Sequence, residues 1–199
     1  MAISTHIFDV AMQPLELAGF ARMRRHVLSA VRGDVLEVGA GSGLNSVYYP
    51  SSAISSLTVT DRQADRAALA RAFSRRPLAD AQISIEDADL MALPFDGRRF
   101  DTIVCTLVLC SVPDVHRAAR EMIRVLRPGG VILFMEHIQS SRPRVKPFLD
   151  TVTPAWRRIA DGCHLNRNTP ALLEEAGLKV HLDHIWFDGL LVSGYATVE

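Results

Sequence analysis

The stretch Asp34-Val35-Leu36-Glu37-Val38-Gly39-Ala40-Gly41-Ser42-Gly43-Leu44-Asn45 decides the fold of this 199-residue chain. Its first half predicts a buried strand that ends in an acidic residue, and its second half is a glycine-rich turn. Glycines let a backbone turn sharply and approach a ligand where a Cβ would clash. The stretch therefore predicts a strand followed by a turn that can face a bound molecule.

A second β-rich run, Leu57-Thr58-Val59-Thr60, ends in Asp61 about 20 residues after that turn. An acidic residue at the end of the second strand is placed to accept hydrogen bonds from a ribose diol. Together the two runs predict a nucleoside-bearing cofactor held across the tips of two parallel strands. The competing interpretation is an ordinary glycine-rich strand-to-helix turn without a ligand, and the position of Asp61 argues against it.

The glycine spacing narrows the choice of cofactor. In the dinucleotide pattern G-x-G-x-x-G the third glycine would fall at Leu44, so a nicotinamide-dependent reductase is only a remote alternative. The pattern G-x-x-x-x-G-K-[ST] is also missing from the sequence, which argues against a P-loop. A carboxylate at Glu37 would repel a pyrophosphate but suits a cationic ligand. S-adenosylmethionine fits, because it carries an ammonium and a sulfonium and no phosphate.

Composition indicates an ordinary soluble protein, with 48% hydrophobic and 22% charged residues. The formal net charge is +0, so we expect no general binding to nucleic acid. Two arginine clusters are expected to be solvated helix faces: Arg22, Arg24 and Arg25, and Arg71, Arg75 and Arg76. We expect no integral membrane segment, since no apolar run reaches about 18 residues, and no secretory signal.

Cysteine and histidine usage predicts neither disulfides nor a metal. The three cysteines are an odd number without a C-x-x-C motif, which favours a reducing cytoplasm. The histidines form no i, i+4 ligand pattern, so we predict no metal site. The sequence does not indicate an oligomeric state.

Strand and helix patterns alternate along the chain, which is typical of an α/β fold with a parallel sheet. We predict a Rossmann-like, doubly wound, mostly parallel seven-stranded sheet with helices on both faces. The predicted strands are 34–38, 56–60, 82–86, 100–107, 131–136, 179–186 and, more weakly, 191–198. The predicted helices are 43–49, 62–75, 114–126, 146–159 and 169–176, after a helical segment within 6–32.

We expect one domain over residues 1–199. Within it, 1–32 would form an N-terminal helical cap and 34–137 the cofactor-binding core. Residues 138–178 would supply the helices and loop on the substrate side, and 179–199 the final strands. Ligands of such sheets bind at the carboxyl ends of the strands near the switch in strand order.

Several motifs resemble the class I S-adenosylmethionine-dependent methyltransferases, the group that includes ubiquinone and menaquinone methyltransferases. The resemblance covers 34–137 and rests on an ordered set of segments: Val35 to Gly43, Thr60-Asp61, Glu86-Asp87-Ala88, Leu93-Pro94-Phe95, Phe100-Asp101 and Arg124 to Gly130. It implies that Glu37, Gly39 and Gly41 hold the methionine moiety, that Asp61 binds the ribose, and that Asp87 and Ala88 contact the adenine. Neighbouring residues are expected to complete the cofactor site: Ala40, Asn45, Arg62, Thr106 and Leu107.

A narrower resemblance points to small methyltransferases grouped with the mammalian methyltransferase-like seven proteins, which are alkyl thiol S-methyltransferases. It rests on Cys105 to Val112, Met135-Glu136-His137 and Trp156 to Arg167. It implies a small, rather apolar methyl acceptor, with a thiol or selenol as the first candidate. The alternatives are an N-, O- or C-methyltransferase of a natural product, quinone or lipid head group, and a binding protein without catalysis. The membrane anchor of the mammalian proteins is not carried over.

Two histidines are candidates for a catalytic base, since histidine titrates near neutral pH. His137 follows the fifth strand, and His164 lies in a loop that could close over the site. The alternative for each is a structural histidine bonded to a backbone carbonyl. Other residues are given structural roles: Asp161, Asn166 and Arg167 in capping the helix at 169–176, Cys110 and Cys163 as small hydrophobes, and Phe8, Met12 and Trp156 in lining the pocket.

Overall fold

The computed structural model describes residues 16–50, 52–75, 78 and 81–198. Much of the predicted N-terminal cap, including Phe8 and Met12, lies outside these residues. The described helical elements are η1 (Glu16–Phe20), α2 (Ala21–Leu28), η2 (Leu44–Val47), α3 (Arg66–Ser74), α4 (Val115–Val125), α5 (Val145–Ile159), α6 (Thr169–Glu175) and η3 (Phe187–Gly189). The strands are β1 (Gly33–Val38), β2 (Ile54–Asp61), β3 (Gln82–Asp87), β4 (Phe100–Thr106), β5 (Leu126–His137), β6 (Leu178–Trp186) and β7 (Leu191–Val198).

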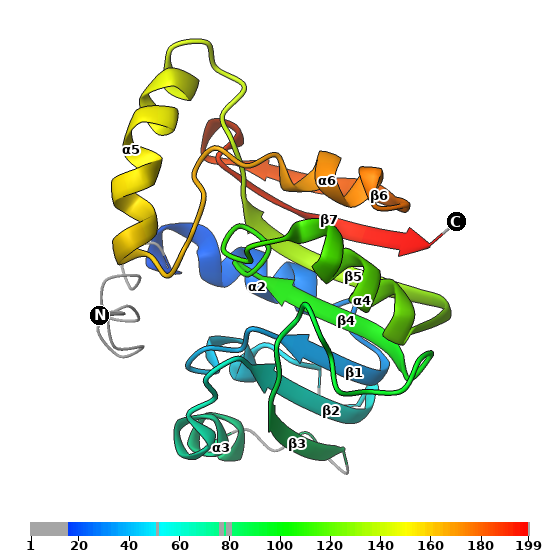
Figure 1. Cartoon of the computed structure of the whole chain (residues 1–199). Coiled ribbons are helices and arrows are strands. Elements are labelled where there is room, and N and C mark those ends of the chain that lie inside the picture. The colour runs from blue at the N-terminus through cyan, green and yellow to red at the C-terminus, as the bar shows by residue number, and fades with distance from the viewer. Residues whose placement is uncertain (1–15, 51, 76–77, 79–80, 199) are drawn as a thin grey trace.

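The seven strands form one twisted sheet with the order β3-β2-β1-β4-β5-β7-β6 (Figure 1). Strands β1 to β5 pair in parallel, whereas β7 lies antiparallel between β5 and β6. The strand order reverses between β1 and β4, which is where ligands of such sheets bind. The prediction of a doubly wound, mostly parallel seven-stranded sheet is confirmed.

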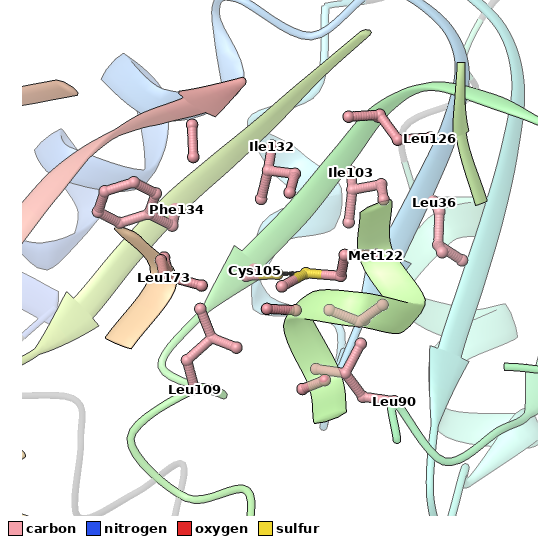
Figure 2. Packing of buried hydrophobic residues seen from close by; sticks show 14 of the residues in the cluster. Leu36, Leu90, Ile103, Cys105, Leu109, Met122, Leu126, Ile132, Phe134 and Leu173 are labelled. Atoms are coloured by element: carbon pink, nitrogen blue, oxygen red, sulfur yellow. Dashed lines mark hydrogen bonds between the residues drawn. The ribbon is translucent and has the colours of Figure 1, made fainter. Parts of the chain in front are cut away.

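The central strands are buried on both faces, so successive side chains enter two different cores. In β4, Ile103 and Cys105 point into the core beneath α4 and α6, while Val104 points into the core beneath α2 and α3. Figure 2 shows the first core, where Met122 of α4 packs beside Cys105 and Ile103. Helices therefore cover both faces of the sheet, as predicted.

Three element boundaries differ from the predictions. The predicted helix 43–49 is only the short 3-10 turn η2, and it begins at Leu44 because Gly43 has a left-handed φ of 84° outside the helix. Helix α3 starts at Arg66 rather than at 62, because the Asp65 carboxylate accepts the N–H of Ala68 at 2.9 Å and caps the helix there. Strand β5 already starts at Leu126 rather than at 131, and its pairing with β4 changes register between Phe100 and Thr102.

Helix α5 stands apart from the sheet, on the side to which the parallel strands point (Figure 1). It buries Leu149 and Thr153 and exposes Phe148, Trp156 and Ile159. Among the described residues, no helix has the length and apolar character needed to cross a membrane.

Candidate active site

Polar residues gather where the parallel strands end. Glu37 lies near the end of β1, Asp61 ends β2, Asp87 ends β3, Thr106 ends β4 and His137 ends β5. Asp61 and Asp87 stand directly opposite each other in the parallel pairing of β2 and β3. The structure thus brings the predicted site residues to one edge of the sheet.

The glycine turn is shaped by two different constraints. Gly39 has φ 61°, and a Cβ there would lie 2.5 Å from Cγ2 of Val108. Gly41 has φ 55°, but a Cβ there would meet no atom within 4 Å. Gly39 is therefore required by both backbone and packing, whereas Gly41 is required by its left-handed backbone and borders open space.

Asp61 fixes the turn from the next strand. One oxygen of its carboxylate accepts the N–H of Gly41 at 2.8 Å and the other accepts the N–H of Gln63 at 3.1 Å. The Ala88 N–H donates to the Asp61 carbonyl at 3.0 Å. The carboxylate predicted to face a ribose is thus held beside the glycine turn by backbone donors.

Glu37 is buried in a hydrogen-bonded network rather than exposed to solvent. Its oxygens accept bonds from the Asn45 amide and the Tyr49 hydroxyl, both at 2.8 Å. Asn45 also donates to the Thr106 hydroxyl at 2.9 Å, so the network joins the ends of β1 and β4. Burial raises the pKa of Glu37 to about 7 in spite of these donors.

Arg24 completes this network and corrects an expectation from the sequence. We expected it to be solvated like Arg22 and Arg25, but it is only 5% exposed, while those two arginines are exposed. Its Nη1 donates to the side-chain oxygen Oδ1 of Asn45 at 2.9 Å and to the Thr106 hydroxyl at 3.2 Å. Hydrophobic spacing on α2 could not reveal this contact, because its partners are far along the chain.

The adenine side of the predicted site is more open. Asp87 is exposed and accepts the N–H of Ala64 at 3.1 Å, and it forms an ion pair with Arg66 at 3.3 Å. Arg62, also predicted to bind the cofactor, is exposed on the turn after β2. These residues line the outer rim, next to Ala88.

A buried carboxylate organises the loop after β4. Glu136 is fully buried and accepts three backbone N–H groups, from Val108 at 2.9 Å, Leu109 at 3.0 Å and Cys110 at 3.1 Å. Leu107, which enters this loop, has a left-handed φ of 61°. Burial raises the pKa of Glu136 to about 7 although these donors lower it.

The two candidate histidines differ in their surroundings. Nδ1 of His137 is buried and makes no hydrogen bond within the described part of the chain, and burial lowers the pKa of this residue to about 4. In His164, Nδ1 lies 3.1 Å from the Cys110 carbonyl oxygen and Nε2 lies 3.4 Å from an Arg167 nitrogen. His164 thus has the contacts expected of a structural histidine, whereas Nδ1 of His137 makes no hydrogen bond to the described residues.

The loop carrying His164 is tied to the Glu136 loop, but not through helix capping. Arg167 donates to the carbonyls of Leu109 at 2.6 Å and Val112 at 2.8 Å, and Asn166 donates to Asp150 at 2.8 Å. The N-cap of α6 is Asn168 and it makes no side-chain capping bond. The prediction that Asp161, Asn166 and Arg167 cap this helix is therefore wrong: Asn168 is the N-cap residue, and the Asn166 and Arg167 side chains reach other segments.

The two cysteines of these loops interact with each other. Cys110 and Cys163 share a side-chain hydrogen bond, which raises the pKa of Cys110 together with burial. The same bond lowers the pKa of the Cys163 thiol. Cys110 is buried as expected of a small hydrophobe, whereas Cys163 is only half-buried. Within the described residues, no group of three or more potential ligand side chains is placed to hold a metal ion.

Comparison with known proteins agrees with this geometry. A family model for a methyltransferase domain matches residues 36–134. The chain is 32% identical over 183 residues to human thiol S-methyltransferase TMT1A, covering 91% of this chain and 75% of that protein. It is 32% identical over 177 residues to human thiol S-methyltransferase TMT1B, covering 88% and 72%.

A solved structure shares the fold. An S-adenosylmethionine-dependent methyltransferase from Mesorhizobium loti superposes with a TM-score of 0.64 at 21% identity, covering 88% of this chain and 95% of that one. The fold, the glycine turn with its acidic partners and these matches show that the chain belongs to the class I S-adenosylmethionine-dependent methyltransferases. Its cofactor is S-adenosylmethionine and its acceptor is a small molecule. Within that class it is similar to the thiol S-methyltransferases TMT1A and TMT1B over most of its length.

The glycine turn after β1 fits a bound cofactor on structural grounds. A Cβ at Gly41 would meet no atom within 4 Å, so a ligand can approach the backbone there, and the neighbouring Ser42 hydroxyl is a buried polar atom without a hydrogen bond to the described residues. Buried polar atoms normally have partners, so such atoms are expected where a ligand binds.

Proposed function

We propose that this methyltransferase transfers the methyl group to a small, rather apolar thiol or selenol. The observation that carries the proposal is the extent of the match to TMT1A, which covers 91% of the chain. The general methyltransferase match ends at residue 134, so the match to TMT1A also includes most of the segment 138–178 expected on the substrate side. Similarity there supports a shared class of acceptor rather than a shared cofactor alone.

In methyl transfer of this kind the protein mainly positions the acceptor and excludes water, and the bound cofactor supplies an electrophilic methyl group. A thiol of pKa ~8.5 is already partly ionised near neutral pH, so it needs little help from a base. The Glu136 carboxylate holds the loop 107–112 against the end of β5, which fixes one wall of the site. A site that only positions a partly ionised thiol beside the cofactor needs few catalytic groups.

His137 is the group that we propose receives a hydrogen bond from the acceptor. Its low pKa keeps the imidazole neutral at pH 7, so the free Nδ1 is able to accept a hydrogen bond from an S–H group. So weak a base does not take the proton, so His137 would orient the acceptor through this hydrogen bond, and the thiol proton would go to solvent before the thiolate attacks the methyl group and displaces the cofactor sulfur. His164 is a poorer candidate, since both ring nitrogens already face protein groups.

We also propose the cofactor contacts that the resemblance to the methyltransferases implies. Asp61 is held beside the glycine turn and suits the ribose, while Asp87 and Ala88 at the end of β3 suit the adenine. Three free thiols, Cys105, Cys110 and Cys163, also support a reducing compartment such as the cytoplasm.

The test is a transfer assay with radiolabelled S-adenosylmethionine and four matched acceptors: an alkyl thiol, a phenol, an amine and a quinol. Selective labelling of the thiol is the expected result. Labelling of another acceptor, or tight cofactor binding with no transfer to any of the four, would overturn the thiol proposal.

Two matched variants test the role of His137. The change His137→Gln is expected to lower turnover with the labelled acceptor about 100-fold while cofactor affinity stays within about twofold. His164→Gln serves as the control and is expected to alter stability more than turnover. Equal losses of turnover in the two variants would remove the special role of His137.

A further inference from the structure

Two cysteines meet where the loop after β4 touches the loop between α5 and α6. The side chains of Cys110 and Cys163 share a hydrogen bond. The two backbones are joined at the same point, since the N–H of His164 donates to the Cys110 carbonyl oxygen at 2.8 Å. Chains joined by such a bond lie about 5 Å apart, as in a sheet, and the Cα atoms of a disulfide lie about 4.4–6.8 Å apart. A disulfide between these cysteines therefore needs no large movement of the backbone.

Further contacts hold the two loops in this position. Nδ1 of His164 lies 3.1 Å from the same Cys110 carbonyl oxygen. Arg167 donates to the carbonyls on either side of Cys110, those of Leu109 at 2.6 Å and Val112 at 2.8 Å. The approach of the two cysteines is thus fixed by the backbone and by an arginine, and not by the thiols alone.

The two thiols differ in exposure and in charge. Cys163 is half-buried, and its pKa is lowered by hydrogen bonds with Cys110 and the Trp156 indole and by the positive charge of Arg167. Cys110 is buried, and its hydrogen bond with Cys163 together with burial raises its pKa. The thiolate is the form that attacks an oxidant. Cys163 is therefore the thiol that reacts first, and Cys110 is the neighbour that can close the bond.

We propose that Cys110 and Cys163 form a reversible disulfide when the protein meets a peroxide. The Cys163 thiolate attacks one peroxide oxygen and the O–O bond breaks, which leaves a sulfenic acid and a hydroxide that takes a proton to become water. The Cys110 sulfur then attacks the Cys163 sulfur, the S–O bond breaks, and the Cys110 proton leaves with the hydroxide as a second water. Two thiols lose two electrons, and the peroxide gains them.

The disulfide would act on a wall of the methyl-transfer site. The Cys110 thiol is also hydrogen-bonded to the Glu136 carboxylate, which holds the loop 107–112, and this donor is lost when the disulfide forms. Both cysteines are free thiols in the structure. In a reducing compartment disulfides are transient and serve catalysis or redox sensing. The inference does not depend on which acceptor the enzyme methylates.

The test treats reductant-free protein with hydrogen peroxide, at a dose that oxidises free glutathione. The remaining thiols are then blocked with iodoacetamide in urea, and the cysteines are mapped by mass spectrometry without reduction. We expect a peptide linked through Cys110 and Cys163, with Cys105 alkylated. Dithiothreitol should restore all three thiols.

Three variants separate the roles of the thiols. In Cys110→Ser the sulfenic acid on Cys163 has no neighbouring thiol, so dimedone should label it about tenfold more than in the wild type. In Cys163→Ser the buried Cys110 should stay reduced. Cys105→Ala is the control and should form the same disulfide as the wild type, since Cys105 packs against Met122 in the core.

The wild-type map decides the matter even if Cys110→Ser does not fold. Three unreacted thiols after treatment would overturn the proposal, and so would a disulfide through Cys105 or between two chains. A lasting sulfenic acid on Cys163 in the wild type would also overturn it, because Cys110 would then not reach its neighbour.

Discussion

The change Gly39→Ala tests how the glycine turn is held against the loop after β4. The new Cβ would lie 2.5 Å from Cγ2 and 3.0 Å from Cγ1 of Val108, and the backbone φ of 61° is left-handed. Left-handed strain for alanine costs about 1–2 kcal/mol, and overpacking costs about 1–3 kcal/mol. We therefore expect the free energy of unfolding to fall by about 2–5 kcal/mol.

Three further variants separate these contributions: Gly41→Ala, Val108→Ala, and Gly39→Ala combined with Val108→Ala. Gly41→Ala places a Cβ at a similar φ of 55° with no atom within 4 Å, so it should show only the strain, about 1–2 kcal/mol. The double change Gly39→Ala with Val108→Ala removes both methyl contacts and leaves only the Val108 Cβ position at 3.3 Å, so it should cost about 1–3 kcal/mol less than the sum of the single changes.

Urea unfolding without cofactor measures the free energies of the wild type and the four variants under one condition. Additive effects of Gly39→Ala and Val108→Ala within about 0.5 kcal/mol would refute the steric argument. Equal costs for Gly39→Ala and Gly41→Ala would do the same, because strain alone would then explain both.

Three other predictions follow from the site. Asp61→Ala should weaken cofactor binding about tenfold, since it removes a ribose acceptor and frees the Gly41 N–H; unchanged affinity by calorimetry would exclude that role. Burial lowers the pKa of His137 from 6.5 to about 4, so between pH 7.5 and 5 only the unfolded state takes up a proton at this residue. The free energy of unfolding of the wild type should therefore fall by about 2 kcal/mol more than that of His137→Gln over this range. Parallel pH profiles of the two proteins in urea unfolding would contradict this. Cys163 should be alkylated before Cys110 by iodoacetamide, as the hydrogen bond between them lowers the pKa of Cys163 and raises that of Cys110; mass spectrometry showing the reverse order would refute the assignment.

The sheet could be predicted from the sequence because its strands are short apolar runs that end in polar residues or glycines. The run 102–105 is apolar without alternation, and the structure buries it on both faces. The glycine turn and Asp61 could also be predicted, since each directly follows or ends an apolar strand in the sequence. The hydrogen bond between Gly41 and Asp61 shows that these two segments meet.

Arg24 could not be recognised in this way. Its neighbours on α2 are solvated arginines, and its contacts lie with Asn45 and Thr106, which are distant in sequence. The same holds for Tyr49, whose hydroxyl reaches Glu37 from the end of a short turn. Periodicity reports which face of an element is apolar, but it does not report a polar side chain that crosses from one element to another.

The order of the last two strands constrains how the chain can be built during translation. Strand β6 pairs only with β7 in the described sheet, and β7 is made after it and inserts between β6 and β5. The half of the sheet from β1 to β5 can therefore assemble while the ribosome is still elongating, but β6 has to wait. Until β7 emerges, both β5 and β6 present open edges, so this interval is the stage of synthesis at which the nascent protein most needs protection from aggregation.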